Sequence, residues 1–215
     1  MIPSAQKIGV DVPWVSSWSQ EAQGGVGPCP TVDGAMAALQ VWKPGVGEPL
    51  YARNHLRRQR DSVRAMLCPM CGEPTPEGDR WSQTGRFYAA GILRARGFGK
   101  ALPADLDDDR VILDCGAIAP MHFRCASVSM QQCPHLATLP DHDLKAFPPT
   151  WVVIPLYVEA RQPVGGKVLP AVSFLQLIGL TITRDPDWRK GLPERATSRA
   201  DRSTGGPHRT VRSVR

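Results

Sequence analysis

The chain has 215 residues, of which 42% are hydrophobic and 7% aromatic, and its formal net charge is +6. This length holds one ordinary domain, or one small domain with appendages, and the 21 prolines and 20 glycines predict a loop-rich α+β architecture around a modest core. The most apolar runs, residues 151–158 and 174–182, fall far short of the roughly 20 residues that cross a bilayer, which excludes them as membrane spans.

The first residues lack the basic stretch and sustained apolar run of a signal peptide, so we expect a cytoplasmic protein. In such a reducing compartment, closely spaced cysteines are more often metal ligands or redox groups than disulfides. The charge is unevenly spread, because residues 184–215 carry nine Lys or Arg against four Asp or Glu. Their composition predicts a disordered basic tail, which either contacts a polyanion or only keeps the chain in solution.

Residues 1–50 are weakly patterned, and clusters of Gly and Pro at 24–30 and 44–49 interrupt any long element. We therefore predict a loop-rich N-terminal arm that contains only short strands. Cys29 lies between two prolines and has no close cysteine partner, so we interpret it as a loop cysteine rather than a metal ligand.

Residues 54–67 form the clearest predicted helix, with Asn54 as its N-cap and apolar residues recurring on one side. The remainder of the helix is basic and carries four arginines: Arg57, Arg58, Arg60 and Arg64. Two interpretations stay open. The arginines form an ordinary solvated face, or they form a nucleic-acid-binding surface, because bidentate guanidinium donors are well suited to phosphate.

Two short pairs of metal-ligand residues follow. Cys68 and Cys71 stand in the run Leu-Cys-Pro-Met-Cys-Gly, and His122 and Cys125 stand in Met-His-Phe-Arg-Cys-Ala. Two cysteines separated by two residues allow a tight turn to aim both thiolates at one ion, and Gly72 suits the left-handed backbone of such a turn. His122 and Cys125 are three apart, hence on one face of a helix. These four residues predict a structural zinc site.

The elements between these pairs predict the type of zinc module. Strands are expected at 79–82 and 111–115, and a helix is expected to begin at Pro120, since proline is favoured in a first helical turn. This order of knuckle, strand pair and ligand-bearing helix is that of a treble-clef zinc finger.

The fourth ligand is not decided by spacing alone. Cys133 or His135, in the run Cys-Pro-His-Leu, is an alternative to His122. We favour the interpretation that Pro134 ends the helix and that Cys133 packs as a small apolar group. Cys115 alternates with Leu113 along a predicted strand, so we interpret it as a core residue.

Residues 150–183 contain two runs rich in β-branched and aromatic residues, which predict a β-hairpin. Residues 165–167 between them lack the spacing and the Ser or Thr of a phosphate loop, so we interpret them as part of a turn. The predicted organisation has four parts: an N-terminal arm (1–50), the basic helix with the zinc module (51–136), the hairpin region packed on that module (137–183) and the basic tail (184–215).

Several catalytic motifs are missing. His55 is not followed two positions later by the Glu that a zinc deaminase needs, and the Cys68–Cys71 pair follows a helix instead of opening one as in thioredoxin-like proteins. A metal-dependent nuclease of the histidine-metal type stays an alternative. The histidines that could serve it as bases are His55, His122, His135 and His142.

The three short motifs together resemble a group of small uncharacterised proteins from actinobacteria and their phages. These proteins have a Cys-x-x-Cys-Gly knuckle, a Cys/His-x-x-Cys-Ala helix start and a terminal Cys-Pro-His/Tyr-Leu, and the resemblance covers residues 68–136 only. It implies zinc at Cys68, Cys71, His122 and Cys125, together with a phage or mobile-element setting. It implies no activity.

The leading functional prediction is a non-catalytic, zinc-stabilised module that binds nucleic acid through its basic helix and tail. The first alternative is a structural or protein-interaction component of a phage or host-takeover complex, motivated by the loop-rich arm and the hairpin. The nuclease is the second alternative. The sequence indicates neither a membrane partner nor a small-molecule substrate.

Overall fold

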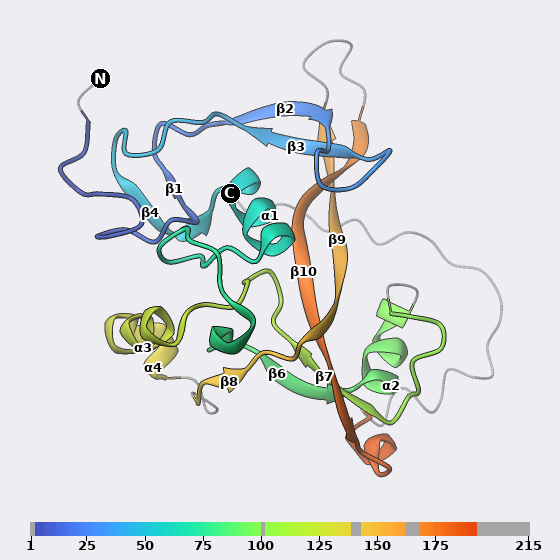
Figure 1. Ribbon diagram of the computed structural model, residues 1–215. Coiled ribbons are helices and arrows are strands. Elements are labelled where there is room, and N and C mark those ends of the chain that lie inside the picture. The colour runs from blue at the N-terminus through green and yellow to red at the C-terminus, as the bar shows by residue number, and fades with distance from the viewer. Residues whose placement is uncertain (1–2, 100–101, 139–142, 162–167, 193–215) are drawn as a thin grey trace.

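The computed structural model describes residues 3–99, 102–138, 143–161 and 168–192 (Figure 1). It is a mixed α+β structure, as predicted. The strands are β1 (Ser16–Trp18), β2 (Gln23–Pro28), β3 (Met36–Gln40), β4 (Pro49–Asn54), β5 (Trp81–Ser82), β6 (Arg86–Ala89), β7 (Arg110–Asp114), β8 (Lys145–Ala146), β9 (Thr150–Arg161) and β10 (Val168–Arg184). The helices are α1 (Leu56–Ala65), α2 (Ala90–Leu93), α3 (Phe123–Gln132) and α4 (Pro134–Ala137), with short 3-10 helices at Glu77–Asp79 and Trp188–Gly191 and a π-type turn at Arg94–Phe98. Within these residues, none of the helices has the length and apolar character that a membrane span requires.

β10 is the central strand of the main sheet, whose order is β2-β3-β10-β7-β6. β3 and β7 pair with different parts of one edge of β10, and β9 pairs with its other edge. β9 and β10 pair antiparallel along the whole of β9, which forms the predicted hairpin, although its turn lies outside the described residues. On its opposite edge, β10 pairs in parallel with β3 at Val172 and antiparallel with β7 from Ile178 onward. One strand therefore joins the N-terminal strands to the strand that precedes the metal-ligand helix.

Helix α1 fills the gap between β3 and β7 along β10. Gln59 accepts a hydrogen bond from the N–H of Leu175 at 2.9 Å and donates one to the Leu175 carbonyl at 2.7 Å, as a neighbouring strand would. Arg60 donates to the Ser173 carbonyl at 2.8 Å. A buried backbone group without a partner costs about 1–3 kcal/mol, so these polar side chains complete the sheet where strands are missing.

Helix α1 begins later than predicted. Asn54, the predicted N-cap, is instead the last residue of β4 and pairs with Ser16 of β1. His55 is the N-cap, and its Nδ1 accepts from the Arg58 N–H at 3.3 Å. The pairing of β1 with β4 takes precedence over the local capping preference of asparagine because it fixes the extended backbone up to residue 54.

Residues 3–50, which were predicted to form a loop-rich arm, pair and pack with the rest of the described chain. β2 and β3 belong to the main sheet, and β1 pairs with β4. Trp18 has no exposed surface, and the Trp14 N–H donates to the Met70 carbonyl within the metal-ligand knuckle at 2.8 Å. The boundary placed at residue 50 therefore does not coincide with a break in strand pairing or hydrogen bonding.

The apolar core has separate clusters on either side of the sheet and around the knuckle. One cluster lies between α1 and β10 and includes Val63, Leu175 and Leu177. A second joins α2 to the other end of the sheet through Ile112 and Ile178. A smaller one surrounds the predicted metal ligands and includes Cys68, Met121 and Ala126.

Candidate metal centre

The four predicted metal ligands lie together in the structure. Cys68, Cys71, His122 and Cys125 each offer one ligand atom, and these atoms all lie within 4.8 Å of one another. His122 Nδ1 is 3.5 Å from Cys71 Sγ and 3.9 Å from Cys125 Sγ. This group could hold a metal ion, with two ligands from the knuckle after α1 and two from the start of α3.

A short hydrogen-bonded turn positions the knuckle cysteines. The Gly72 N–H donates to the Cys68 carbonyl, and the Cys68 N–H donates to the Glu73 carbonyl, both at 2.8 Å. Gly72 has a φ of +84°, and a Cβ at this position would lie 2.7 Å from the ring of Trp14. Glycine is therefore required both by the backbone conformation and by the packed indole, which confirms the left-handed glycine predicted here.

His122 is oriented by a hydrogen bond on the far side of its ring. Nε2 lies 3.1 Å from the Pro74 carbonyl, so Nε2 carries the proton and Nδ1 turns its lone pair toward the thiols. His122 is the N-cap of α3, which starts at Phe123 and so three residues later than predicted. Asp79 accepts from the Phe123 N–H at 2.7 Å in place of a side-chain cap. The start of α3 thereby fixes His122 and, on the same helix face, Cys125.

The electrostatics of the thiols favour a cation at this position. Burial raises the pKa of the Cys68 thiol, although backbone hydrogen bonds partly oppose this. Burial, together with the neighbouring Cys68 and Cys71, raises the pKa of Cys125 to about 12. Thiols gathered in an apolar environment do not ionise side by side without a compensating positive charge, and a bound divalent metal ion supplies one.

The remaining cysteines lie elsewhere. Cys115 is 3% exposed and belongs to the core between α1 and β10, as predicted. Cys29 lies in the loop after β2, as predicted, but its side chain is buried in the same core. Cys133 is not a member of the metal group. The side chain of His135 lies outside the described part of the chain, so its role as an alternative ligand stays a prediction.

The structure separates the four arginines of the predicted nucleic-acid-binding face. Arg57 and Arg64 are exposed, whereas Arg58 and Arg60 are only 0% and 2% exposed. Arg58 makes a bidentate ion pair with Glu21 at 2.8 and 2.7 Å, and Arg60 bonds to backbone carbonyls of β10. The prediction of one solvated or phosphate-contacting face is therefore wrong for Arg58 and Arg60, because their donors are already used inside the fold.

A buried polar network around Arg58 was not foreseen from the sequence. His55 has no exposed surface, and its Nε2 lies 3.2 Å from the Val41 carbonyl while Nδ1 accepts from the Arg58 N–H. Burial and the nearby Arg58 lower the pKa of His55 to about 4, despite the carboxylate of Glu21, so the imidazole is neutral. Glu21 lies 37 residues from Arg58 along the chain, and no short-range pattern indicates this pairing.

The histidines proposed as nuclease bases are not gathered in one place by the described residues. His55 is enclosed in the buried network and has no access to a substrate. His122 belongs to the metal group. His142 and the side chain of His135 lie outside the described residues. No geometry in the described part of the chain therefore supports the nuclease.

Comparisons with protein-family models, with curated proteins and with solved structures gave no match for this chain. The resemblance to actinobacterial and phage proteins therefore stays a prediction from the motifs of residues 68–136. The metal-ligand group, set into a mixed α+β fold, is the feature of the described residues that indicates a role.

Proposed function

We propose that the metal is zinc and that it stabilises the fold. Zn–S and Zn–N bonds of about 2.3 and 2.0 Å in a tetrahedron place a sulfur and a nitrogen ligand about 3.5 Å apart. Cys71 Sγ and His122 Nδ1 are separated by 3.5 Å. Four protein ligands fill the tetrahedron, so such an ion has no open position for water or substrate.

The order of knuckle and ligand-bearing helix supports a treble-clef-like assignment. The segment between the two ligand pairs departs from a compact finger, however, because it passes through β6 and β7 of the main sheet. Zinc at this position ties the end of α1 to the start of α3, and so holds together two segments that the sheet itself does not connect directly.

The zinc proposal is tested by metal analysis of the purified wild type, of Cys71→Ser and of the control Cys133→Ser. We expect one zinc per chain in the wild type and in the control, and loss of both zinc and cooperative unfolding in Cys71→Ser, because a structural zinc contributes folding free energy directly. Zinc retained by Cys71→Ser but lost by Cys133→Ser would overturn the ligand set.

We further propose that the protein is non-catalytic and associates with protein through the outer edge of β9. Among the described residues, β9 pairs only with β10. It is 12 residues long and has no charged residue between Thr150 and Val158. Val153 and Tyr157 are 38% and 56% exposed. Native edge strands are usually short, charged or covered. The uncharged stretch of residues 150–158, unpaired on this side although β2 approaches part of β9, is therefore the observation that carries the proposal.

The direction of the backbone groups on β9 follows from its pairing with β10. Leu175 and Leu177 of β10 bond through both N–H and C=O to groups on the side away from β9. Their partners in register are Pro155 and Val153, whose backbone groups therefore face the open edge. Pro155 lacks an N–H, so it weakens this edge at one point without interrupting the ladder between β9 and β10.

A second copy of β9 is the occupant that this edge fits best. In an antiparallel pair about a two-fold axis, the same strand faces itself, and the outward backbone groups of both copies continue the ladder. The uncharged stretch of residues 150–158 brings no like charges together in such a pair. The protein would then act as a structural, self-associating component.

The association is measured by sedimentation equilibrium and by amide hydrogen exchange over a range of protein concentrations. We expect a reversible dimer in which the amides of Val153 and Tyr157 become protected on association. The amides of Val152 and Ile154, which face β10, stay protected in both states. Lysine at position 153 leaves an unpaired charge in the interface, so Val153→Lys should weaken the dimer by about tenfold or more.

Ile182→Lys is the matched control, because Ile182 is 92% exposed on β10 beyond the residues paired with β9. We expect this variant to dimerise like the wild type. A protein that stays monomeric while the Val153 amide exchanges freely would refute self-association. Protection of the same amides only by a different protein would replace the second copy with a heterologous strand.

Nucleic-acid binding is the second candidate function, with a smaller surface than the sequence predicted. The Arg57 side chain is 63% exposed, and its guanidinium lies 5.2 Å from the ring of Trp42, which is 48% exposed. Exposed aromatic rings beside arginine serve as stacking sites for single-stranded nucleic acid. Filter binding at low salt should show retention that Arg57→Gln reduces and that Arg86→Gln, at an exposed arginine of β6, does not. No retention of DNA or RNA would remove this candidate.

A further inference from the structure

The metal group gathers three thiols, and two thiols that lie close together can also form a disulfide. The ligand atoms of Cys68, Cys71, His122 and Cys125 all lie within 4.8 Å of one another, so a small movement of the side chains brings two sulfurs into contact. A disulfide between any two of the cysteines leaves one thiol and one imidazole, which are too few ligands for a tetrahedral zinc site. Oxidation of this group therefore opposes metal binding.

The three thiols differ in their access to solvent. Cys68 has no exposed surface, whereas Cys71 and Cys125 are each partly exposed. Cysteines that react with oxidants are those whose sulfur the oxidant can reach. An oxidant in solution therefore meets Cys71 and Cys125 before it meets Cys68.

Hydrogen bonds also hold the Cys68 sulfur in place. It accepts from the backbone N–H groups of Met70, Cys71 and His122. Buried donors that lose their partner destabilise the fold. Movement of the Cys68 sulfur into a disulfide would take it away from these donors. Both burial and hydrogen bonding therefore favour Cys71 and Cys125 as the pair that reacts.

On the basis of the zinc site proposed above, we propose that this group is a redox switch in which hydrogen peroxide joins Cys71 to Cys125 and releases the metal. One thiolate attacks the peroxide and becomes a sulfenic acid, with release of hydroxide. The second thiolate attacks that sulfur, forms the S–S bond and expels a second hydroxide. The two thiolates thus give two electrons to the peroxide, two protons convert the hydroxides to water, and zinc leaves as Zn²⁺.

This disulfide would connect the same two segments as the zinc. Cys71 lies in the knuckle after α1, and Cys125 lies in the first turn of α3. A disulfide between Cys68 and Cys71 would join two residues of one turn and leave the knuckle and α3 unconnected. A link that closes a loop of about fifty residues stabilises a fold more than a link within one turn. We therefore expect the oxidised, zinc-free protein to stay folded.

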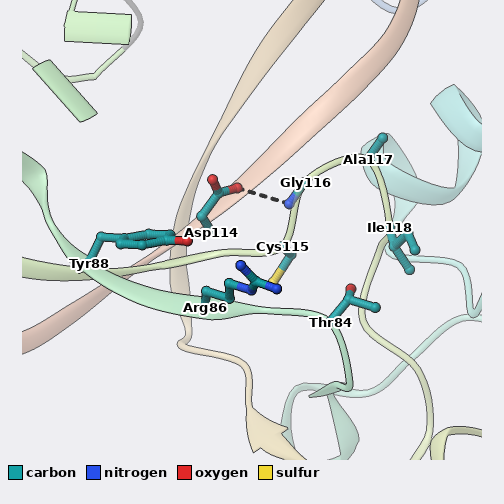
Figure 2. A pocket seen from close by; sticks show the side chains of 8 residues that line it. All are labelled: Thr84, Arg86, Tyr88, Asp114, Cys115, Gly116, Ala117 and Ile118. Atoms are coloured by element: carbon teal, nitrogen blue, oxygen red, sulfur yellow. Dashed lines mark hydrogen bonds between the residues drawn. The ribbon is translucent and has the colours of Figure 1, made fainter. Parts of the chain in front are cut away.

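The remaining cysteines provide internal controls. Cys29 and Cys115 are only 8% and 3% exposed, so an oxidant has little access to them. Figure 2 shows Cys115 beside Arg86 at a separate pocket, and burial raises the pKa of its thiol to about 12. Cys133 is partly exposed and lies outside the metal group. Oxidation of Cys133 therefore reports the general reactivity of an accessible thiol.

The test begins with purified protein whose zinc content has been measured. Hydrogen peroxide is added, zinc release is followed with a chromogenic chelator, and cysteine pairing is determined by mass spectrometry of peptides. We expect one zinc to be released per chain and Cys71 to be linked to Cys125, while Cys68 stays a thiol. Dithiothreitol and added zinc should restore the metal-bound form. In urea the oxidised protein should unfold cooperatively, unlike reduced protein stripped of zinc by a chelator.

Cys125→His separates the reacting pair from the zinc site itself. Two cysteines and two histidines hold zinc as three cysteines and one histidine do, so this variant should keep its metal. It cannot form the disulfide between positions 71 and 125, and we expect peroxide to release its zinc about tenfold more slowly, or slower still. Cys133→Ser is the matched control and should release zinc at the wild-type rate.

Zinc retained by the wild type at a peroxide concentration that oxidises Cys133 would overturn the switch and leave the zinc site intact. A disulfide between Cys68 and Cys71, sulfinic acids in place of a disulfide, or equal release rates for the wild type and Cys125→His would also overturn it. Wild-type protein without zinc would overturn the zinc site and the switch together. The mapping of cysteine pairs uses the wild type, so the test does not depend on the folding of a variant.

Discussion

Replacement of Gln59 by methionine should remove a large part of the free energy of unfolding of this protein. Gln59 is 1% exposed and bonds to both backbone groups of Leu175 and to the Ala117 carbonyl. Methionine has nearly the same volume, so the cavity term is small. The N–H and C=O of Leu175 then stay buried without partners, at about 1–3 kcal/mol each, and the expected loss is about 2–6 kcal/mol. Domains of this kind have about 5–15 kcal/mol in total.

Urea unfolding followed by tryptophan fluorescence measures this loss. With an m-value of about 3 kcal/mol/M, the upper end of the usual range, we expect the midpoint to fall by about 0.7–2 M at an unchanged slope. Gln131→Met is the control, because Gln131 is exposed on α3 and should change stability by no more than about 0.5 kcal/mol. A loss below about 0.5 kcal/mol for Gln59→Met would refute the idea that this side chain replaces a missing strand.

Three further perturbations probe the buried network and the knuckle. Glu21→Gln should lower the free energy of unfolding by about 3–5 kcal/mol, because it leaves Arg58 charged and buried. In urea unfolding, the double variant with Arg58→Met should lose less free energy of unfolding than the two single variants together. The pKa of His55 is lowered to about 4 in the folded protein, against about 6.5 unfolded, so its contribution to stability is complete above pH 6.5 and is lost as the pH falls toward 4. Between pH 7 and pH 5 the free energy of unfolding should therefore fall by about 2 kcal/mol. His55→Asn should abolish this fall, because asparagine does not titrate yet still serves as an N-cap. Gly72→Ala should cost more than about 1–2 kcal/mol and lower the zinc content, because a Cβ there meets Trp14.

Each of these three predictions would be contradicted by a particular result. Additive losses in the Glu21 and Arg58 variants would mean that the two side chains do not stabilise one another. An unchanged pH dependence in His55→Asn would assign the acid sensitivity to other groups. For the knuckle, Gly45→Ala is the control, because Gly45 has a φ of +76° with open space around it. Equal losses of stability in Gly72→Ala and Gly45→Ala would mean that contact with Trp14 does not contribute to the effect of Gly72→Ala.

The metal-ligand group could be predicted from the sequence because its constraints are local. A pair of cysteines two residues apart needs only a tight turn with Gly72, and His122 and Cys125 need only one turn of helix. The hairpin of β9 and β10 is equally local, since its two runs follow one another along the chain. That the two ligand pairs meet across about fifty residues was inferred from the chemistry of zinc, which needs four ligands.

The inward direction of Arg58 and Arg60 was decided only by the tertiary structure. From the sequence, the arginine side chains of such a helix are predicted to be exposed, because charged side chains usually remain in water. Here β3 and β7 leave a gap along β10, and Arg60 and Gln59 bond to the backbone groups exposed there. Arg58 meets a carboxylate from the far N-terminal segment. These partners depend on long-range strand pairing, whereas the helix itself and the spacing of the metal ligands depend only on neighbouring residues.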